Sequence, residues 1–118
     1  MIKHLTPRSE EEIETYLAAV SLKDLIFGMD SNFMKKELCR RLHIVDIGMN
    51  GLRICAVNFI HSVVQYYTVI VHMRGYNRKY MYDALEKEDI HYEIEDEESD
   101  EYNDYTKNVY KIRMKIYK

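Results

Sequence analysis

The sequence predicts an α+β fold, in which N-terminal helices precede a β-α-β-β unit with a small mixed sheet and a C-terminal β-hairpin. Apolar residues recur with helical spacing near the N-terminus, a β-branched and aromatic segment follows at 67–73, and the segment 90–118 alternates between apolar and polar. A chain of 118 residues can bury one core. We therefore expect a single domain, 1–118, helical over 6–65 and β-α-β-β over 66–118.

Capping residues and apolar spacing predict three helices in the first part of the chain. Their expected ranges are residue 6 or 9 to about 20, residues 22–27 and residues 31–43. Ser21 has the position and chemistry of an N-cap for the second helix, and Gly28 ends it. Asp30 or Ser31 caps the third helix, whose outer face is basic.

The segment 52–65 supports two interpretations. Its apolar residues follow helical spacing, which predicts a helix after the turn at 48–51, but its β-branched content keeps a β-hairpin open as the alternative. Cys39 and Cys55 both fall on apolar faces of the expected helices and match no zinc or CxxC spacing. They are predicted to be free, buried thiols in a reducing compartment.

The segment 67–73 has strong strand propensity, and Asn77 is expected to cap a helix over 78–87. A strand, a helix and a second strand in this order usually contain parallel strands, so the sheet is expected to be mixed. The C-terminal hairpin has arms at 90–95 and 110–116. In both arms apolar residues alternate with charged ones, which predicts one core face and one charged face.

The charged face of the hairpin opposes unlike charges. Glu93 and Glu95 on the first arm face Lys111, Arg113 and Lys115 on the second. Unlike charges that oppose each other across antiparallel strands stabilise that pairing by roughly 0.2–1 kcal/mol each. This pattern favours an antiparallel hairpin over any other pairing of the two arms.

An acidic block lies around and between the two arms. Residues 86–104 contain eleven carboxylates and one lysine, a balance of −10, whereas the whole chain carries −3, so the remaining residues carry +7. The part at 96–104 is too hydrophilic to pack and is expected to be a loop. Such an asymmetry in charge is typical of a protein that binds an oppositely charged surface, although many acidic loops are only solvated.

The leading functional hypothesis is a non-enzymatic interaction module whose acidic hairpin docks on a basic surface of a partner protein. Carboxylates on a rigid hairpin can imitate a row of phosphates and act as a nucleic-acid mimic. Phage-type inhibitors of defence nucleases, including anti-CRISPR-like proteins, work in this way as a functional type. The expected binding residues are Glu93, Glu95, Asp96, Glu97, Glu98, Asp100, Glu101, Tyr102, Asp104 and Tyr105.

The alternative hypothesis is a helix-turn-helix DNA-binding regulator, with 31–43 as the recognition helix. Lys35, Lys36, Arg40 and Arg41 would contact phosphates. A hairpin with ten net negative charges would be repelled by DNA, which disfavours this interpretation. A structural domain that forms a homo-oligomer is a third hypothesis.

Other classes of function lack their motifs in this sequence. The five histidines show no metal-ligand spacing, no glycine-rich phosphate loop is present, and no nucleophile has a base and an orienting group beside it. We therefore expect no enzyme activity, no metal and no cofactor. The longest apolar-rich run, 54–73, contains too many polar residues to span a bilayer, and a cytoplasmic protein without a membrane partner is expected.

Overall fold

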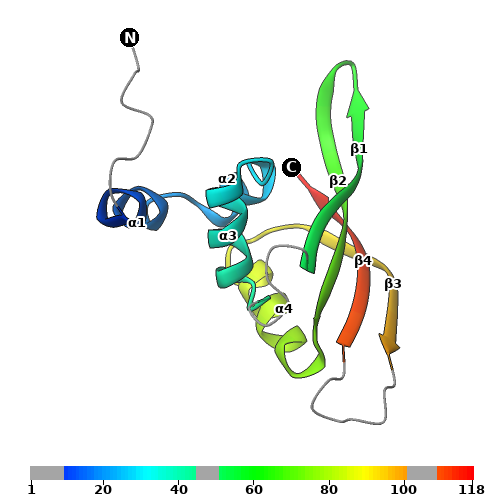
Figure 1. The fold of residues 1–118 in the computed structure, drawn as a ribbon. Helices are drawn as coiled ribbons and strands as arrows, with labels where there is room; N and C mark the ends of the chain where they lie inside the picture. Colours follow the sequence, from blue (N-terminus) through cyan, green and yellow to red (C-terminus); the bar gives the residue numbers. More distant parts are fainter. Residues whose placement is uncertain (1–9, 45–50, 101–108) are drawn as a thin grey trace.

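The computed structural model describes residues 10–44, 51–100 and 109–118. Within these residues, helices gather on one side of the molecule and a four-stranded sheet forms the other (Figure 1). The helices are α1 Glu10–Ala18, α2 Leu22–Phe27, α3 Asn32–Arg41 and α4 Arg78–Lys87, with a short 3-10 turn, η3, at Gly75–Asn77. The strands are β1 Leu52–Ile60, β2 Val63–Arg74, β3 Tyr92–Asp100 and β4 Val109–Tyr117. The predicted α+β class is confirmed.

The local signals of the sequence place the short helices well. The Ser21 side chain accepts a hydrogen bond from the backbone N–H of Asp24 at 3.1 Å, which is the expected cap of α2. Gly28 follows α2, and a Cβ at this position would lie 3.0 Å from the Asp24 carbonyl oxygen and 3.0 Å from Met34 Cε. A side chain at Gly28 would therefore crowd the turn between α2 and α3. The hydroxyl of Ser31 makes no capping bond to α3.

The middle of the chain forms the hairpin that the sequence left as the alternative, so the helix predicted over 52–65 is wrong. The β-branched and aromatic residues of β1 pair with β2 in an antiparallel ladder that runs from Leu52 opposite Val71 to Ile60 opposite Val63. The two residues of the turn, His61 and Ser62, have φ values of 51° and 65°, which lie in the left-handed region. Asn and Gly are the usual residues of such a turn, and their absence leaves it without a sequence signal.

The strand order is β1-β2-β4-β3, and every neighbouring pair is antiparallel. The predicted mixed sheet is therefore wrong. β2 and β3 run in the same direction, as the helix α4 between them requires, but β4 lies between the two strands and pairs with both. The C-terminal hairpin is confirmed, and its first strand continues to Asp100, so 96–100 is strand and not loop.

The core lies between the helices and one face of the sheet. Ile112, Met114 and Ile116 alternate along β4 and are at most 2% exposed, as the predicted core face requires. They pack with buried residues of the helices and of β1 and β2, among them Leu25, Ile26, Leu38, Leu42, Met81, Leu85, Leu52, Val69, Val71 and Met73. The opposite face of the sheet has no described helix over it (Figure 1).

Candidate functional site

The acidic segment forms β3, an edge strand of the sheet that pairs only with β4 among the described strands. Every residue from Glu93 to Ser99 is exposed. Five of these residues are carboxylates: Glu93, Glu95, Asp96, Glu97 and Glu98. Because the ladder with β4 holds the backbone, the carboxylates stand on an extended edge of defined geometry.

A β-bulge divides this row of carboxylates. The register shifts between Ile94 and Asp96, which leaves Glu95 as the additional residue on β3. The register pairs are Glu93 with Lys115, Asp96 with Arg113, Glu97 with Ile112 and Glu98 with Lys111. The bulge thus places Asp96 and Glu98 opposite basic residues on the open face of the sheet. It turns Glu97 toward the side that the helices cover.

Glu95 pairs with both neighbouring cations of β4, which agrees with the predicted contact between unlike charges on the two arms. Its Oε2 lies 3.3 Å from Arg113 Nε, and its Oε1 lies 3.7 Å from Lys115 Nζ. All three side chains are between 31% and 46% exposed. Ion pairs with this exposure each contribute at most about 1 kcal/mol. Their main effect is to hold Glu95 near β4.

Glu97 is held by Arg78 at the start of α4. Nη1 of Arg78 donates a hydrogen bond to Glu97 Oε1, and Nε donates to the Gly75 carbonyl oxygen at 3.2 Å. The guanidinium carbon lies 3.7 Å from the centre of the Tyr110 ring, within the range of a cation–π contact. Burial alone would lower the pKa of Arg78, but the hydrogen bond and charge of Glu97 raise it above its usual value. Glu97 therefore connects β3 to α4.

Two tyrosines make a second connection between β3 and α4. The rings of Tyr82 and Tyr92 stack with centroids 5.9 Å apart and an interplanar angle of 5°. The Tyr92 hydroxyl donates a hydrogen bond to Glu86 Oε1 at 3.1 Å. Burial first, and then this hydrogen bond and the charge of Glu86, raise the pKa of Tyr92 to about 12. The Tyr82 hydroxyl is buried and has no hydrogen-bond partner in the described part of the chain.

Among the described carboxylates of β3, Asp96 and Glu98 stay available to a partner. Both are exposed, and neither side chain has a hydrogen bond or ion pair with another described residue. They stand on the same face of the strand, two residues apart, which corresponds to about 6.8 Å. The side chain of Asp100 and the expected binding residues Glu101, Tyr102, Asp104 and Tyr105 lie outside the described residues.

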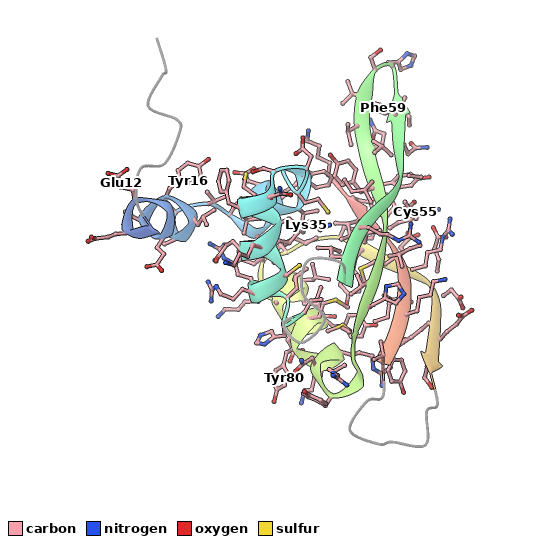
Figure 2. The ribbon with its side chains drawn as sticks, viewed as in Figure 1. Glu12, Tyr16, Lys35, Cys55, Phe59 and Tyr80 are labelled. Atoms are coloured by element: carbon pink, nitrogen blue, oxygen red, sulfur yellow. The ribbon has the colours of Figure 1, made fainter. Side chains whose placement is uncertain are left out.

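The basic residues of α3, which the regulator hypothesis requires, differ in the contacts that they make. Glu37 accepts hydrogen bonds from Arg40 at 2.6 and 2.8 Å and from Arg41 Nε at 2.8 Å. The hydrogen bonds from Arg40 first, and those from Arg41 next, lower the pKa of Glu37 against the opposing effect of burial. Lys35 is half-buried and Lys36 is exposed. Figure 2 shows Lys35 on α3, on the helical side of the molecule.

Arg41 has a structural role that the sequence did not indicate. Its Nη1 donates to the Val20 carbonyl oxygen at 2.7 Å, and its Nη2 donates to the Leu17 carbonyl oxygen. These oxygens lie at and just beyond the C-terminal end of α1, where helical carbonyls lack partners within the helix. Arg41 therefore joins α1 to α3 and Glu37, and its guanidinium is not free to contact DNA.

The surface that sequence reasoning missed is the hairpin of β1 and β2. Phe59, Ile60 and Val63 are 57%, 54% and 58% exposed. The helix prediction placed Phe59, Ile60 and Val63 on a buried apolar face, and this was wrong. The β-branched content of the segment was the one signal that favoured strands, and it did not indicate their exposure.

The two thiols differ in their environment. Cys39 is buried, as predicted, and burial raises the pKa of its thiol. Cys55 is exposed, so its predicted burial is wrong. It is the additional residue at a β-bulge, since Ile54 pairs with Val69 and Ala56 pairs with Thr68. The helical periodicity that placed Cys55 on an apolar face does not apply to a strand.

The residues that the structure describes contain no group of three or more His, Cys, Asp or Glu side chains with the arrangement of a metal site. None of the described helices has the length and apolar character needed to cross a membrane. Comparison of the chain with protein-family models, with curated proteins and with solved structures found no match. The chemistry of the chain's own surfaces is therefore the basis for a functional proposal.

Proposed function

We propose that the protein is a non-enzymatic interaction module, which docks the acidic edge strand β3 on a basic surface of a partner protein. The observation that carries this proposal is the exposure of five carboxylates between Glu93 and Glu98 on one edge strand. An edge strand leaves one side of its backbone and its side chains accessible. Since β4 holds the strand, little conformational entropy is lost when the strand binds.

The spacing of the carboxylates fits a surface that normally binds nucleic acid. An antiparallel strand rises about 3.4 Å per residue, and phosphates along one strand of duplex DNA are also about 3.4 Å apart along the axis. Counted over both faces of the strand, the carboxylates at positions 95–98 have a linear charge density similar to that of one DNA strand, and on one face Asp96 and Glu98 are about 6.8 Å apart, the spacing of every second phosphate. A partner of this kind would be a nucleic-acid-processing or defence complex, and the protein would act as a phage-type inhibitor.

The described contacts rank the carboxylates in this proposal. Asp96 and Glu98 have no ion pair to break, so a lysine or arginine of the partner can approach them directly. Glu95 and Glu97 would have to exchange their contacts with Arg113 and Arg78. We therefore expect Asp96 and Glu98 to contribute more to association than Glu95 and Glu97 do.

The regulator hypothesis receives less support from the same structure. Arg41 is occupied by the carbonyl groups of Leu17 and Val20, and it shares the carboxylate of Glu37 with Arg40. A phosphate would have to displace Glu37 from both arginines. Because the neighbouring carboxylate also repels phosphate, α3 is a poor recognition helix. We do not propose DNA binding.

The first experiment compares the capture of host proteins by the wild type and by the double variant Asp96→Asn with Glu98→Gln. The control, Glu11→Gln with Glu14→Gln, removes two exposed carboxylates from α1 and changes the net charge equally. Mass spectrometry should identify a basic protein that the wild type and the control retain and the β3 variant loses. Equal retention by all three proteins would contradict the proposal.

The second experiment uses the purified partner and measures the association rate as a function of salt. Charge steering makes association fast at low salt and slower as salt screens the charges. The β3 variant should associate several-fold more slowly and show a weaker salt dependence, with little change in its thermal midpoint. Tight, salt-sensitive binding of the wild type to duplex DNA would contradict the proposal and favour the regulator.

A further inference from the structure

The outer edge of β3 has an unpaired backbone among the described residues. In an antiparallel ladder every second residue of a strand turns its backbone N–H and C=O away from the neighbouring strand. β3 pairs with β4 alone, and no other backbone hydrogen bond to residues 92–100 occurs in the described part of the chain. Figure 1 shows β3 at the margin of the sheet, with no described element beside its outer edge. These backbone groups can pair with a further strand.

The bulge at Glu95 limits the length of edge that is open to pairing. The register with β4 shifts between Ile94 and Asp96 and then continues without a shift to Asp100. A bulge disturbs the outer edge as well, because it bends the strand that contains it. The regular part of the edge is therefore 96–100, which is about 17 Å long. It contains Asp96 and Glu98, the two carboxylates without an ion pair.

The two faces of β3 differ in chemistry. Asp96 and Glu98 stand opposite basic residues of β4 on the open face of the sheet. Ile94 stands opposite the buried Met114, on the face that the helices cover. Ile94 is nevertheless 40% exposed and does not belong to the core cluster, because it lies at the margin of the sheet. A strand placed along β3 would meet carboxylates on one face and an apolar side chain on the other.

The composition of β4 shows which kind of strand suits these two faces. The side chains of a strand stand above and below the sheet, so a neighbour on either side of β3 meets the same two faces. On β4, the inner neighbour, the exposed or half-buried cations Lys111, Arg113 and Lys115 alternate with the buried Ile112 and Met114. The same alternation of cations and apolar residues therefore fits the outer edge.

We propose that the partner of β3 is a basic, extended segment of another protein, which adds to the sheet as a fifth strand along 96–100. This inference rests on the proposed function and specifies how the partner binds. Lysine or arginine side chains at alternate positions lie beside Asp96 and Glu98, and an apolar side chain of the same segment covers Ile94. Backbone hydrogen bonds supply affinity in this mode of recognition, and the alternate side chains supply specificity.

Charge favours a basic segment over an edge strand of a second copy. Pairing of β3 with another β3 would place carboxylates beside carboxylates, which opposes association. β1, the other edge of the sheet, has Arg53 as its one charged residue and contains two register shifts. A neutral strand would desolvate Asp96 and Glu98 without pairing them. The acidic edge therefore selects a basic strand and rejects the others.

The first test uses a synthetic peptide with the sequence of β4, residues 109–117, acetylated and amidated at its ends. The peptide should bind the wild-type protein in a calorimetric titration to about 1 mM. A peptide with Lys111→Glu, Arg113→Glu and Lys115→Glu should not bind, because its carboxylates would face those of β3. Binding of both peptides with equal affinity would overturn the proposal.

Variants of the protein locate the contact. Asp96→Asn with Glu98→Gln should weaken binding of the basic peptide by about tenfold, because two cross-strand charge pairs are lost. Ile94→Ser should weaken it several-fold. The matched control is Ile60→Ser, since Ile60 is also an exposed isoleucine of a strand and lies on the opposite edge strand. It should bind the peptide as the wild type does, and thermal midpoints of all variants verify that the fold is retained. Equal weakening by Ile94→Ser and Ile60→Ser would contradict the placement along β3.

Two isomers of the basic peptide separate strand pairing from charge attraction alone. Each has N-methyl groups on alternate backbone nitrogens, in opposite phase, so the isomers have the same sequence and charge but lack N–H donors on different edges. One isomer should bind about tenfold more weakly than the unmethylated peptide, and the other should keep most of the affinity. Two isomers of equal affinity would overturn the added strand and leave the charge docking of the proposed function intact.

Hydrogen exchange of the protein's own amides shows where the peptide lies. Amides of 96–100 that exchange fast in the free protein should become protected when the peptide binds, and the amides of β4 should keep their protection. Loss of protection along β4 would mean that the peptide replaces β4, and would overturn addition at the outer edge.

The outcomes distinguish this inference from the proposed function. A basic peptide that does not bind, while the β3 variant still loses a host protein that the wild type captures, would overturn the added strand alone. Capture of host proteins that does not depend on Asp96 and Glu98 would overturn the proposed function, whatever the peptide does.

Discussion

Arg41 and Arg40 are adjacent arginines that share Glu37, and substitution of each should have a very different effect. Only Arg41 also donates hydrogen bonds to the Leu17 and Val20 carbonyl oxygens. α1 has nine residues, too few for a stable helix alone, and Leu17 is its buried residue among those described. We therefore expect Arg41→Ala to release α1 from the rest of the protein.

The magnitude follows from the contacts. A hydrogen bond from a charged donor contributes about 1.5–3 kcal/mol, and Arg41 makes two to carbonyl groups. The side-chain freedom that Arg41 loses offsets up to about 2 kcal/mol. The net loss in the docking free energy of α1 should be about 2–3 kcal/mol. Arg40 is 67% exposed, and pairs with that exposure contribute about 0–1 kcal/mol, so Arg40→Ala should have little effect.

Hydrogen exchange of the backbone amides of residues 10–18, followed by mass spectrometry, measures the docking of α1. A loss of 2–3 kcal/mol corresponds to exchange about 30–150-fold faster in Arg41→Ala. Arg41→Lys keeps the charge but cannot donate to two carbonyl groups and Glu37 together, and it should recover less than half of the loss. Equal protection of α1 in Arg40→Ala and Arg41→Ala would refute the assigned role of Arg41.

Three further predictions concern the sheet. Ile112→Ala should lower the free energy of urea unfolding by about 2–5 kcal/mol, because Ile112 is fully buried, and a loss below 1 kcal/mol would contradict its place in the core. Asp96→Asn with Glu98→Gln should leave the thermal midpoint unchanged or slightly higher in a melting experiment, since both carboxylates are exposed beside other carboxylates. The pKa of Tyr92 is raised from 10.0 to about 12 by burial first and then by its hydrogen bond to Glu86, so the folded state holds this proton more tightly than the unfolded chain. Its contribution to stability is complete below about pH 10 and is lost as the pH rises toward 12, so unfolding measured across this range should depend less on pH in Tyr92→Phe.

Sequence reasoning succeeded where the signal is local. α2 and α4 have the predicted bounds. Ser21 caps α2 as predicted, because a cap acts over a single helical turn, but the side chain of Asn77 makes no capping hydrogen bond to α4, so its predicted role as a cap is wrong. The arms of the C-terminal hairpin follow from period-two alternation, and Ile112 and Ile116 face the core as this alternation requires. Glu95 meets Arg113 and Lys115 because unlike charges were placed on facing strands.

The candidate site could be predicted only in part. The carboxylates of β3 were found from composition, but their ranking depends on the bulge between Ile94 and Asp96, which selects Glu97 for the contact with Arg78. A bulge leaves no mark in the pattern of apolar residues when the strand around it is acidic throughout. The structural role of Arg41 was hidden for a related reason, because its partners are carbonyl groups more than twenty residues away.

The sequence by itself determined the α+β class, the positions of α2 and α4, and the charged face of the final hairpin. Tertiary structure alone decided that 52–65 forms two strands, that β4 lies between β2 and β3, and that Cys55 is exposed. The physical reason is the range of the interactions. A cap or a turn involves neighbours in the chain, whereas a segment rich in valine and isoleucine becomes helix or strand according to the backbone that it pairs with. For β1 that backbone is β2, and the register of β2 with β4 is established only when the whole sheet forms.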